Sequence, residues 1–373
     1  MIMAKSKDFF ALRIGIIAAG LLIGGLAATL QRLGNPANMG ICMACFERDI
    51  VGALGLHRAA VVQYLRPEIP AILLGAFISA MLFREYKART GSAPIVRFVL
   101  GMFAMIGALI FLGCPWRALL RLAGGDWNAI IGLIGLIVGV SAGVLFLRNG
   151  YNLGRSSHTR PFIGWIMPAI MIAILLLAVM NPQFGRDAEG KAIGPIFMSE
   201  KGPGSQHAAL AISLIIGLVI GFLAQRTRFC TMGSIRDVVL MGDTHLMSGV
   251  IAFIVAAFVM NLVYGQFHPG FTLGVDAAGK AVMQPAAHTV QYLNFLGMML
   301  AGMAFALAGG CPGRQLILSG EGDGDAGVFV LGMLIGAAVA HNFNMVGNAP
   351  YALPAVIIGL VVVAVIGLLA REK

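Results

Sequence analysis

The sequence predicts an all-α polytopic membrane protein with about ten transmembrane helices and four short re-entrant or half helices, arranged as two inverted repeats. Three observations lead to this prediction. Hydrophobic residues make up 59% of the 373 residues and charged residues only 11%, whereas a soluble domain carries about 25% charged residues. Apolar runs of about 18 residues recur along the chain, each long enough to cross a bilayer. The same cysteine motifs also occur twice in the same order.

The apolar runs give the predicted spans in chain order. We place them at 11–30, 69–83, 95–112, 130–147, 162–180, 208–224, 246–264, 292–308, 327–340 and 355–370. The second and ninth runs are the shortest, and no polar segment between the spans is long enough for a soluble domain. The first run is longer than the apolar part of a cleavable signal peptide and lacks a small-residue cleavage site. We therefore expect it to be a span.

Two cysteine segments recur in the two halves of the chain. In the first half they are Cys42-x5-Arg48-Asp49 and Gly113-Cys114-Pro115-x-Arg117, and in the second half Cys230-x5-Arg236-Asp237 and Gly310-Cys311-Pro312-x-Arg314. Four of the five cysteines therefore occupy matched positions. In duplicated membrane proteins the binding site commonly lies between the repeats. Here such a site would carry thiols and arginines.

Basic residues alternate along the predicted loops as a ten-span topology requires. They gather before the first span, after the second and fourth spans and at the C-terminus: Lys5, Lys7, Arg13, Arg84, Lys87, Arg89, Arg97, Arg148, Arg155, Arg160, Arg371 and Lys373. By the positive-inside rule these loops and both termini are expected in the cytoplasm. The net charge of +10 is thus assigned to helix orientation and not to nucleic-acid binding.

The span count predicts how the repeats are related. Four spans and two cysteine segments fall in 1–160, and the same set falls in 207–345. Between them, 161–206 holds a linking span and a periplasmic loop, and 346–373 is a C-terminal span. An even number of spans followed by a single one turns the second copy upside down, so we expect inverted repeats.

Each Gly-Cys-Pro segment predicts a break in a helix at membrane depth. The residue before proline disfavours α geometry, and proline suits the first position of a new helix. Cys114 and Cys311 would then lie at helix N-termini, which favour negative charge. Arg117 and Arg314 follow one turn later and add positive charge.

The two Arg-Asp dipeptides have two interpretations, and both remain open. Charges within a membrane bundle are usually paired, so Arg48-Asp49 and Arg236-Asp237 are either structural ion pairs or arginines that meet an anion. Cys42 and Cys45 form a lone C-x-x-C, but no paired cysteines or histidines lie nearby to complete a zinc site. Cys45 is therefore interpreted as an auxiliary thiol, and no metal or other cofactor is expected.

These motifs resemble those of the YeeE/YedE family of bacterial inner-membrane sulfur-compound transporters, over nearly the whole chain. The segment 40–49, with its Cys42-Met43-Ala44-Cys45, looks like the YedE branch, which is regarded as transporting selenium. The resemblance implies that substrate passes along Cys42, Cys114 and Cys311, with Cys230 as the repeat mate of Cys42. It also implies a TusA-like sulfur-carrier protein as a cytoplasmic partner. The additional Cys45 departs from the thiosulfate-uptake branch.

The sequence thus favours uptake of a small sulfur- or selenium-containing inorganic anion, first a selenium species and alternatively thiosulfate. Weak thiol donors in series would suit passage better than one tight site. The alternative from another class is a membrane thiol oxidoreductase that uses Cys42 and Cys45. A membrane subunit that only docks a sulfurtransferase, and a channel for another anion, are further alternatives.

Overall fold

The computed structural model describes residues 8–180, 187–189 and 194–371. Its long helices are α1 (Arg13–Arg32), α3 (Glu68–Leu82), α4 (Pro94–Phe111), α6 (Asn128–Arg148), α7 (Ile166–Met180), α8 (Leu210–Thr227), α10 (His245–Val263), α11 (Gln291–Ala308), α13 (Gly324–Asn342) and α14 (Ala352–Leu369). Its short helices are α2 (Met43–Ala53), α5 (Pro115–Ala123), α9 (Thr231–Met241) and α12 (Pro312–Gly320). Two small hairpins pair β1 (Arg89–Thr90) with β2 (Ser157–His158), and β3 (Thr272–Val275) with β4 (Ala281–Met283).

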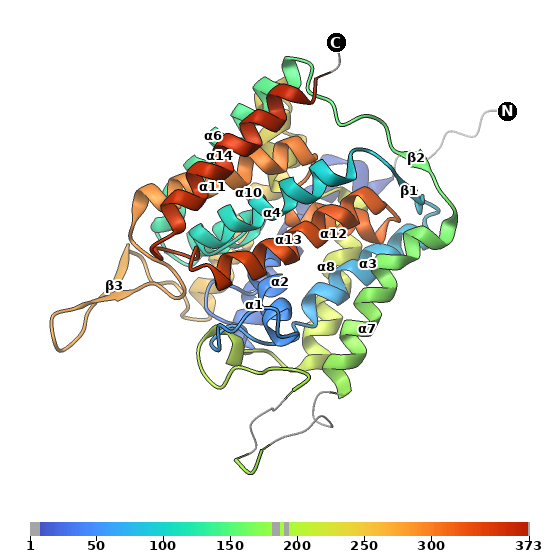
Figure 1. Ribbon diagram of the computed structural model, residues 1–373. Helices are drawn as coiled ribbons and strands as arrows, with labels where there is room; N and C mark the ends of the chain where they lie inside the picture. Colours follow the sequence, from blue (N-terminus) through green and yellow to red (C-terminus); the bar gives the residue numbers. More distant parts are fainter. Residues whose placement is uncertain (1–7, 181–186, 190–193, 372–373) are drawn as a thin grey trace.

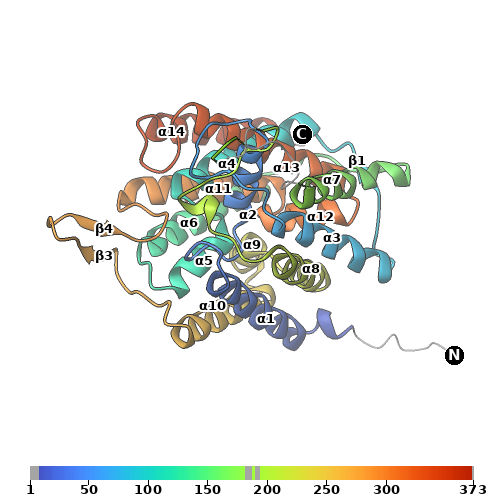
Figure 2. The same ribbon diagram turned by 90° about the horizontal axis from the view of Figure 1, so that it is seen from below.

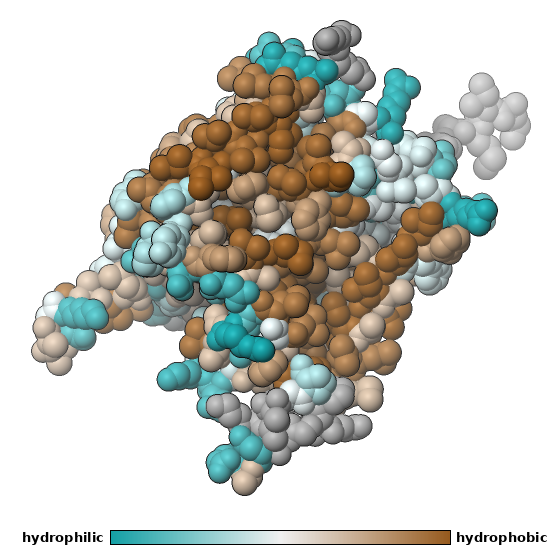
Figure 3. All heavy atoms as spheres, in the orientation of Figure 1, coloured by the Kyte–Doolittle hydropathy of each residue, from teal (hydrophilic) through white to brown (hydrophobic). Residues whose placement is uncertain are grey.

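The predicted fold class is confirmed: the chain is an all-α polytopic membrane protein. In the described part of the chain, 9 helical segments are long and apolar enough to cross a membrane, and Glu68–Leu82 is a shorter apolar helix. The four short helices follow α1, α4, α8 and α11, where the sequence predicted half helices. Apolar residues cover most of the face seen in Figure 3, and polar residues gather toward its margins.

Four pairs of long helices pack in parallel through small residues. Gly20 and Gly24 of α1 face Gly249 and Phe253 of α10, so the contacts advance in the same direction along both helices. The contacts between α3 and α8, between α6 and α11 and between α4 and α13 also advance in the same direction along both helices. Figure 2 shows α1 beside α10 and α3 beside α8. Glycine permits this because its missing side chain lets the backbones approach closely.

The packing pairs exchange when the two halves of the chain are exchanged. If α1, α3, α4 and α6 correspond to α8, α10, α11 and α13, then the contact of α1 with α10 becomes that of α8 with α3. The contact of α6 with α11 likewise becomes that of α13 with α4. Such exchange is expected of two repeats related by a two-fold axis.

The direction of the helices indicates inversion. Arg226 forms ion pairs with Asp8, just before α1, and with Glu85, just after α3. The start of α1 and the end of α3 therefore share a face, and these helices run in opposite directions. Because α10 runs parallel to α1, α3 and its mate α10 are inverted. We propose that 1–160 and 207–345 are inverted repeats, joined by 161–206 and followed by the span in 346–373.

The loops fall on two opposite faces, as the charge pattern predicted. One face, here called the terminal face, holds Asp8 before α1, the basic loops 83–93 and 149–160, and Arg371 after α14. There β1 pairs with β2, and Tyr151 pairs with Arg371. The opposite hairpin face holds β3, β4 and the loops before α8 and α14. Figure 1 shows β1 and β2 on one side and β3 on the other. Lys5, Lys7 and Lys373 lie outside the described residues.

Helices α4 and α11 break at the predicted positions. Leu112 and Gly309 end these helices in the left-handed conformation, with φ of 66° and 85°. Pro115 and Pro312 then begin α5 and α12 after extended Cys114 and Cys311. Glycine adopts positive φ freely, whereas leucine does so at a cost of about 1–2 kcal/mol. The first break is therefore the more strained of the two.

We expect Gly24→Ala to destabilise the bundle, because a Cβ at Gly24 would lie 2.2 Å from the carbonyl oxygen of Phe253. Overpacking of this kind costs about 1–3 kcal/mol. Gly25→Ala is the matched control, since the nearest atom to its Cβ is 3.9 Å away on Met260. Thermal melting of both purified variants in one detergent checks this. Equal melting temperatures would contradict the close packing of α1 against α10.

Candidate functional site

The four matched cysteines all stand immediately before a short helix. Cys114 and Cys311 do so as predicted, and the structure places Cys42 before α2 and Cys230 before α9 in the same way. The Sγ atom of Cys42 accepts a hydrogen bond from the Cys45 N–H at 3.3 Å. The Sγ atom of Cys230 accepts one from the Gly233 N–H at 3.2 Å. Sequence reasoning missed these two caps because no proline marks them.

The cysteines meet in two pairs, one from each half of the chain. The sulfurs of Cys42 and Cys114 lie 3.9 Å apart, and those of Cys230 and Cys311 lie 3.6 Å apart. Cys230 is 5% exposed, whereas the other three are fully buried. We call Cys230 and Cys311 the second thiol pair.

Cys45 joins the first pair and forms with it the first thiol cluster (Cys42, Cys45 and Cys114). Cys45 is fully buried, and its thiol donates to the carbonyl oxygen of Leu112 at 3.8 Å. Its matched position in the second half is Gly233. The two halves therefore present different numbers of thiols.

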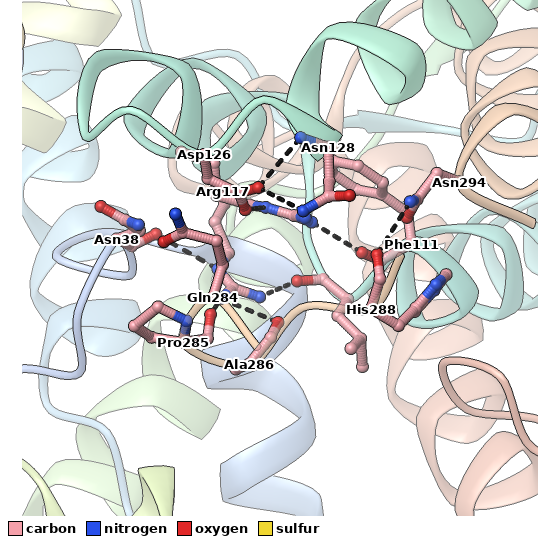
Figure 4. Close-up of polar contacts among 12 residues, drawn as sticks. Asn38, Phe111, Arg117, Asp126, Asn128, Gln284, Pro285, Ala286, His288 and Asn294 are labelled. Carbon is pink, nitrogen blue, oxygen red and sulfur yellow. Dashed lines mark hydrogen bonds and ion pairs between the residues drawn. The ribbon is translucent and has the colours of Figure 1, made fainter. Parts of the chain in front are cut away.

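Arg117 lies beside the first thiol cluster and is fully buried. Its guanidinium donates to the carbonyl oxygens of Asn38, Pro285 and Ala286 at 3.1–3.2 Å, and also to that of Leu112. Figure 4 shows it enclosed by these segments. Its Nη1 atom is 3.8 Å from the Cys45 sulfur. Among the described residues, no carboxylate forms an ion pair with Arg117, which is unusual because buried charges are generally paired.

The segment 284–288 is held over Arg117 from several sides. Gln284 donates to the carbonyls of His268 and Gly270, His288 contacts the Ile110 carbonyl at 2.8 Å, and Asn294 donates to the His288 carbonyl. Figure 4 shows Gln284 and His288 near Arg117, with the hydrogen bond from Asn294 to the His288 carbonyl. The carbonyls that satisfy Arg117 are therefore anchored.

Arg48 and Arg236 each bind the aspartate that follows them. Arg48 lies 2.6 Å from Asp49, which also accepts from Arg66 at 2.8 Å, and all three side chains are at most 3% exposed. Arg236 lies 2.8 Å from Asp237 in a more exposed pair. The ion-pair interpretation accounts for these contacts, and contact with substrate remains a prediction for both arginines.

Arg314 has a different environment from its repeat mate Arg117. It forms an ion pair with Glu321 at 3.0 Å and lines two adjoining cavities on the terminal face. The larger, which we call the terminal cavity, has a volume of about 610 Å³ and reaches Cys230, Arg236 and Arg314. Exposed Arg228 lines both cavities and has no ion-pair partner among the residues that the structure describes.

A separate hairpin cavity of about 360 Å³ opens on the opposite face. Its lining is rich in neutral amides: Gln31, Asn35, Asn38, Gln206, Gln266 and Gln284. Asn38 and Pro285 of this lining accept the hydrogen bonds from Arg117. Arg117 therefore separates the hairpin cavity from the first thiol cluster.

Trp116 lies between the two groups of thiols and was missed by sequence reasoning. It directly follows Cys114-Pro115, is fully buried, and packs edge-on against Phe229, next to Cys230. A Cβ at Gly313, two residues after Cys311, would lie 2.9 Å from its ring. Its indole Nε1–H has no hydrogen-bond acceptor within the described parts of the chain. The only sequence signal was a large aromatic residue where the other repeat has Gly313.

Comparisons with known proteins show that the chain is similar to a transport family. Residues 226–368 match the model of a protein family described as Sulphur transport. The chain is also 31% identical over 104 residues to an uncharacterized protein of Methanocaldococcus jannaschii, across 25% of this chain and 99% of that protein. A transporter family points away from an enzymatic function. Within the described residues no group of three or more His, Cys, Asp or Glu could hold a metal ion.

We expect Asp49→Asn to destabilise the protein strongly, because it leaves the buried cations Arg48 and Arg66 without a carboxylate. Breaking a buried ion pair in this way costs about 3–5 kcal/mol. Asp237→Asn makes the same change at the repeat mate, where Arg236 reaches solvent, and should cost much less. The yield and melting temperature of the monodisperse proteins measure the difference. Two variants of similar stability would refute this role of Asp49.

Proposed function

The chain belongs to the sulphur transport family, also called the YeeE/YedE family, and from this premise we propose that it takes up a small sulfur- or selenium-containing inorganic anion. A selenium species is the first candidate because of the YedE-like segment 40–49, and thiosulfate is the alternative. The route would run from the hairpin cavity past the first thiol cluster and the second thiol pair to the terminal cavity.

The observation that carries this proposal is the buried Arg117 without a carboxylate. Carbonyl dipoles satisfy its N–H groups but leave its charge uncompensated. An anion that arrives from the hairpin cavity would supply the missing negative charge. It would replace the carbonyls of Asn38, Pro285 and Ala286 as the acceptors of the Arg117 hydrogen bonds. Hydrogen bonds to charged groups are worth about 1.5–3 kcal/mol each. Only an anion would therefore displace these carbonyls and open the route at Arg117.

Two kinds of donor line the proposed route between the cavities. The thiols of Cys42, Cys114, Cys230 and Cys311 are weak donors that suit a soft sulfur or selenium atom. The free indole N–H of Trp116 suits an anionic oxygen. Together they favour an anion that carries both a soft atom and oxygens.

The two ends of the route differ in access. Four carbonyl oxygens enclose Arg117, whereas its mate Arg314 lines an open cavity. With the basic loops in the cytoplasm, the terminal cavity would be the cytoplasmic exit and both termini would be cytoplasmic. The protein would then lie in the bacterial inner membrane with its substrate exit open.

The basic residues around the exit would also receive a TusA-like sulfur-carrier protein. Arg84, Lys87 and Arg89 line the cavity that adjoins Arg228 and Arg314. A carrier docked there would accept the transported sulfur or selenium as it leaves. If this docking site is correct, the Arg228→Glu variant will lose binding of the carrier protein. Its transport of substrate into liposomes will be preserved.

Uptake of labelled selenite, selenate and thiosulfate into proteoliposomes tests the route. We expect Cys42→Ala, Cys114→Ala, Cys230→Ala, Cys311→Ala and Arg117→Gln to lower uptake at least tenfold, about 1.4 kcal/mol or more in the barrier. Lys280→Gln, a charge removal on the exposed β3–β4 hairpin, is the control. Wild-type uptake by all four cysteine variants, in correctly folded protein, would sink the thiol route.

Trp116→Phe isolates the indole donor, because it keeps an aromatic ring and removes the N–H. We expect kcat/KM for an oxygen-bearing substrate to fall by about tenfold, the equivalent of one charge-assisted hydrogen bond. Trp127→Phe, on the exposed hairpin face, should leave uptake unchanged. Identical kinetics for Trp116→Phe and the wild type would remove Trp116 from the route.

A further inference from the structure

We propose that the second thiol pair is a redox modification site, at which a peroxide converts Cys230 and Cys311 into a reversible disulfide that stops transport. The disulfide itself rests on geometry alone. Its effect on transport rests on the function proposed above.

The distance between the two sulfurs suits this reaction. They lie 3.6 Å apart, and a disulfide bond is about 2.0 Å long, so the sulfurs must approach by about 1.6 Å. Both residues stand in extended backbone just before a helix. Their side chains already point at one another, so a small movement of the two helix starts would close the gap.

Access distinguishes this pair from the first thiol cluster. Cys230 lines the terminal cavity of about 610 Å³, which is wide enough to admit hydrogen peroxide. Cys42, Cys45 and Cys114 are fully buried, and Arg117 lies between them and the hairpin cavity. A small oxidant on the terminal face would therefore meet Cys230 first.

The thiol of Cys230, neutral while it acts as a donor on the proposed route, has surroundings that stabilise the thiolate formed when it loses its proton. The Gly233 N–H donates to Sγ at 3.2 Å, and the N-terminus of α9 adds its dipole. Arg314 and Arg236 line the same cavity, each paired with one carboxylate, and Arg228 adds a cation that has no ion-pair partner among the described residues. Thiolate is the form of cysteine that attacks peroxides, and cationic groups and helix N-termini promote it. Cys230 is thus the attacking sulfur, and Cys311 is the resolving one.

The reaction balances with one peroxide molecule. The Cys230 thiolate attacks one peroxide oxygen and the O–O bond breaks, which gives a sulfenic acid on Cys230. The hydroxide that leaves takes up the proton that the thiol had lost and becomes water. The Cys311 sulfur then attacks the sulfenic sulfur and releases a second water. Two thiols lose two electrons and two protons to hydrogen peroxide, which becomes two waters. Cytoplasmic dithiols reverse the bond by exchange.

The disulfide would affect both broken segments of the second half at once. It would tie the start of α9 to the start of α12 and remove both S–H donors from the route. Because the cytoplasm keeps thiols reduced, the site would stay open in normal growth and close under oxidative stress.

Mass spectrometry of the purified full-length protein tests the bond directly. After hydrogen peroxide and blocking of free thiols with N-ethylmaleimide, we expect one cross-linked peptide pair that joins Cys230 to Cys311, lost again with dithiothreitol. Cys42→Ser should retain the bond. Cys311→Ser should retain Cys230 as a sulfenic acid that dimedone traps. An absent bond, or a bond between Cys42 and Cys114 in its place, would overturn the proposal.

Thiosulfate uptake by the same oxidised proteoliposomes tests the effect. We expect uptake to fall at least tenfold with peroxide and to recover with dithiothreitol, whereas it should respond to peroxide much less in Cys311→Ser, relative to that variant's own baseline. Unchanged uptake by fully oxidised protein would overturn the switch. A reduced protein that transports none of the three labelled anions would overturn the proposed function, while the mass measurement still decides the disulfide.

Discussion

The structure depends on how its helix breaks are satisfied inside the bundle. A broken helix leaves carbonyls unpaired, and lipid offers them no donors. At the end of α4, Arg121 donates to Phe111 and Arg117 donates to Leu112. At the end of α11, Arg97 and Gln315 both donate to Ala308. The breaks that create cysteine-bearing helix starts thus require cations or amides nearby, and these same groups make the surroundings attractive to anions.

The two halves of the chain carry similar helix breaks whose surroundings differ. Cys45 is matched by Gly233, and Trp116 by Gly313. Trp116 occupies the space that a side chain at Gly313 would need. The two halves therefore pack together here because one has a large residue and the other has glycine. Arg117 is enclosed by Asn38, Pro285 and Ala286, whereas Arg314 pairs with Glu321 beside open space. Two halves with similar helix breaks therefore have different interiors.

The sequence predicted the fold closely because local chemistry determines it. Apolar runs of about 18 residues favour spans, and a proline after Cys114 and Cys311 favours a new helix start, so both cysteines were placed correctly. The pairing of sulfurs, the shared use of Asp49 by Arg48 and Arg66, and the unpartnered indole of Trp116 depend on residues far apart in the chain. No spacing rule within one segment contains that information.

The unequal enclosure of Arg117 and Arg314 has a thermodynamic consequence. A barrier that differs at its two ends changes the rate at which substrate enters the route from each side. Microscopic reversibility means that such a barrier cannot by itself raise the substrate concentration on one side of the membrane. Accumulation in the cell would need a separate driving force, such as irreversible capture of the delivered atom or the flow of a coupled ion. On the proposed route, the asymmetric bundle would select which anion passes, and that separate driving force would set the direction of net flow.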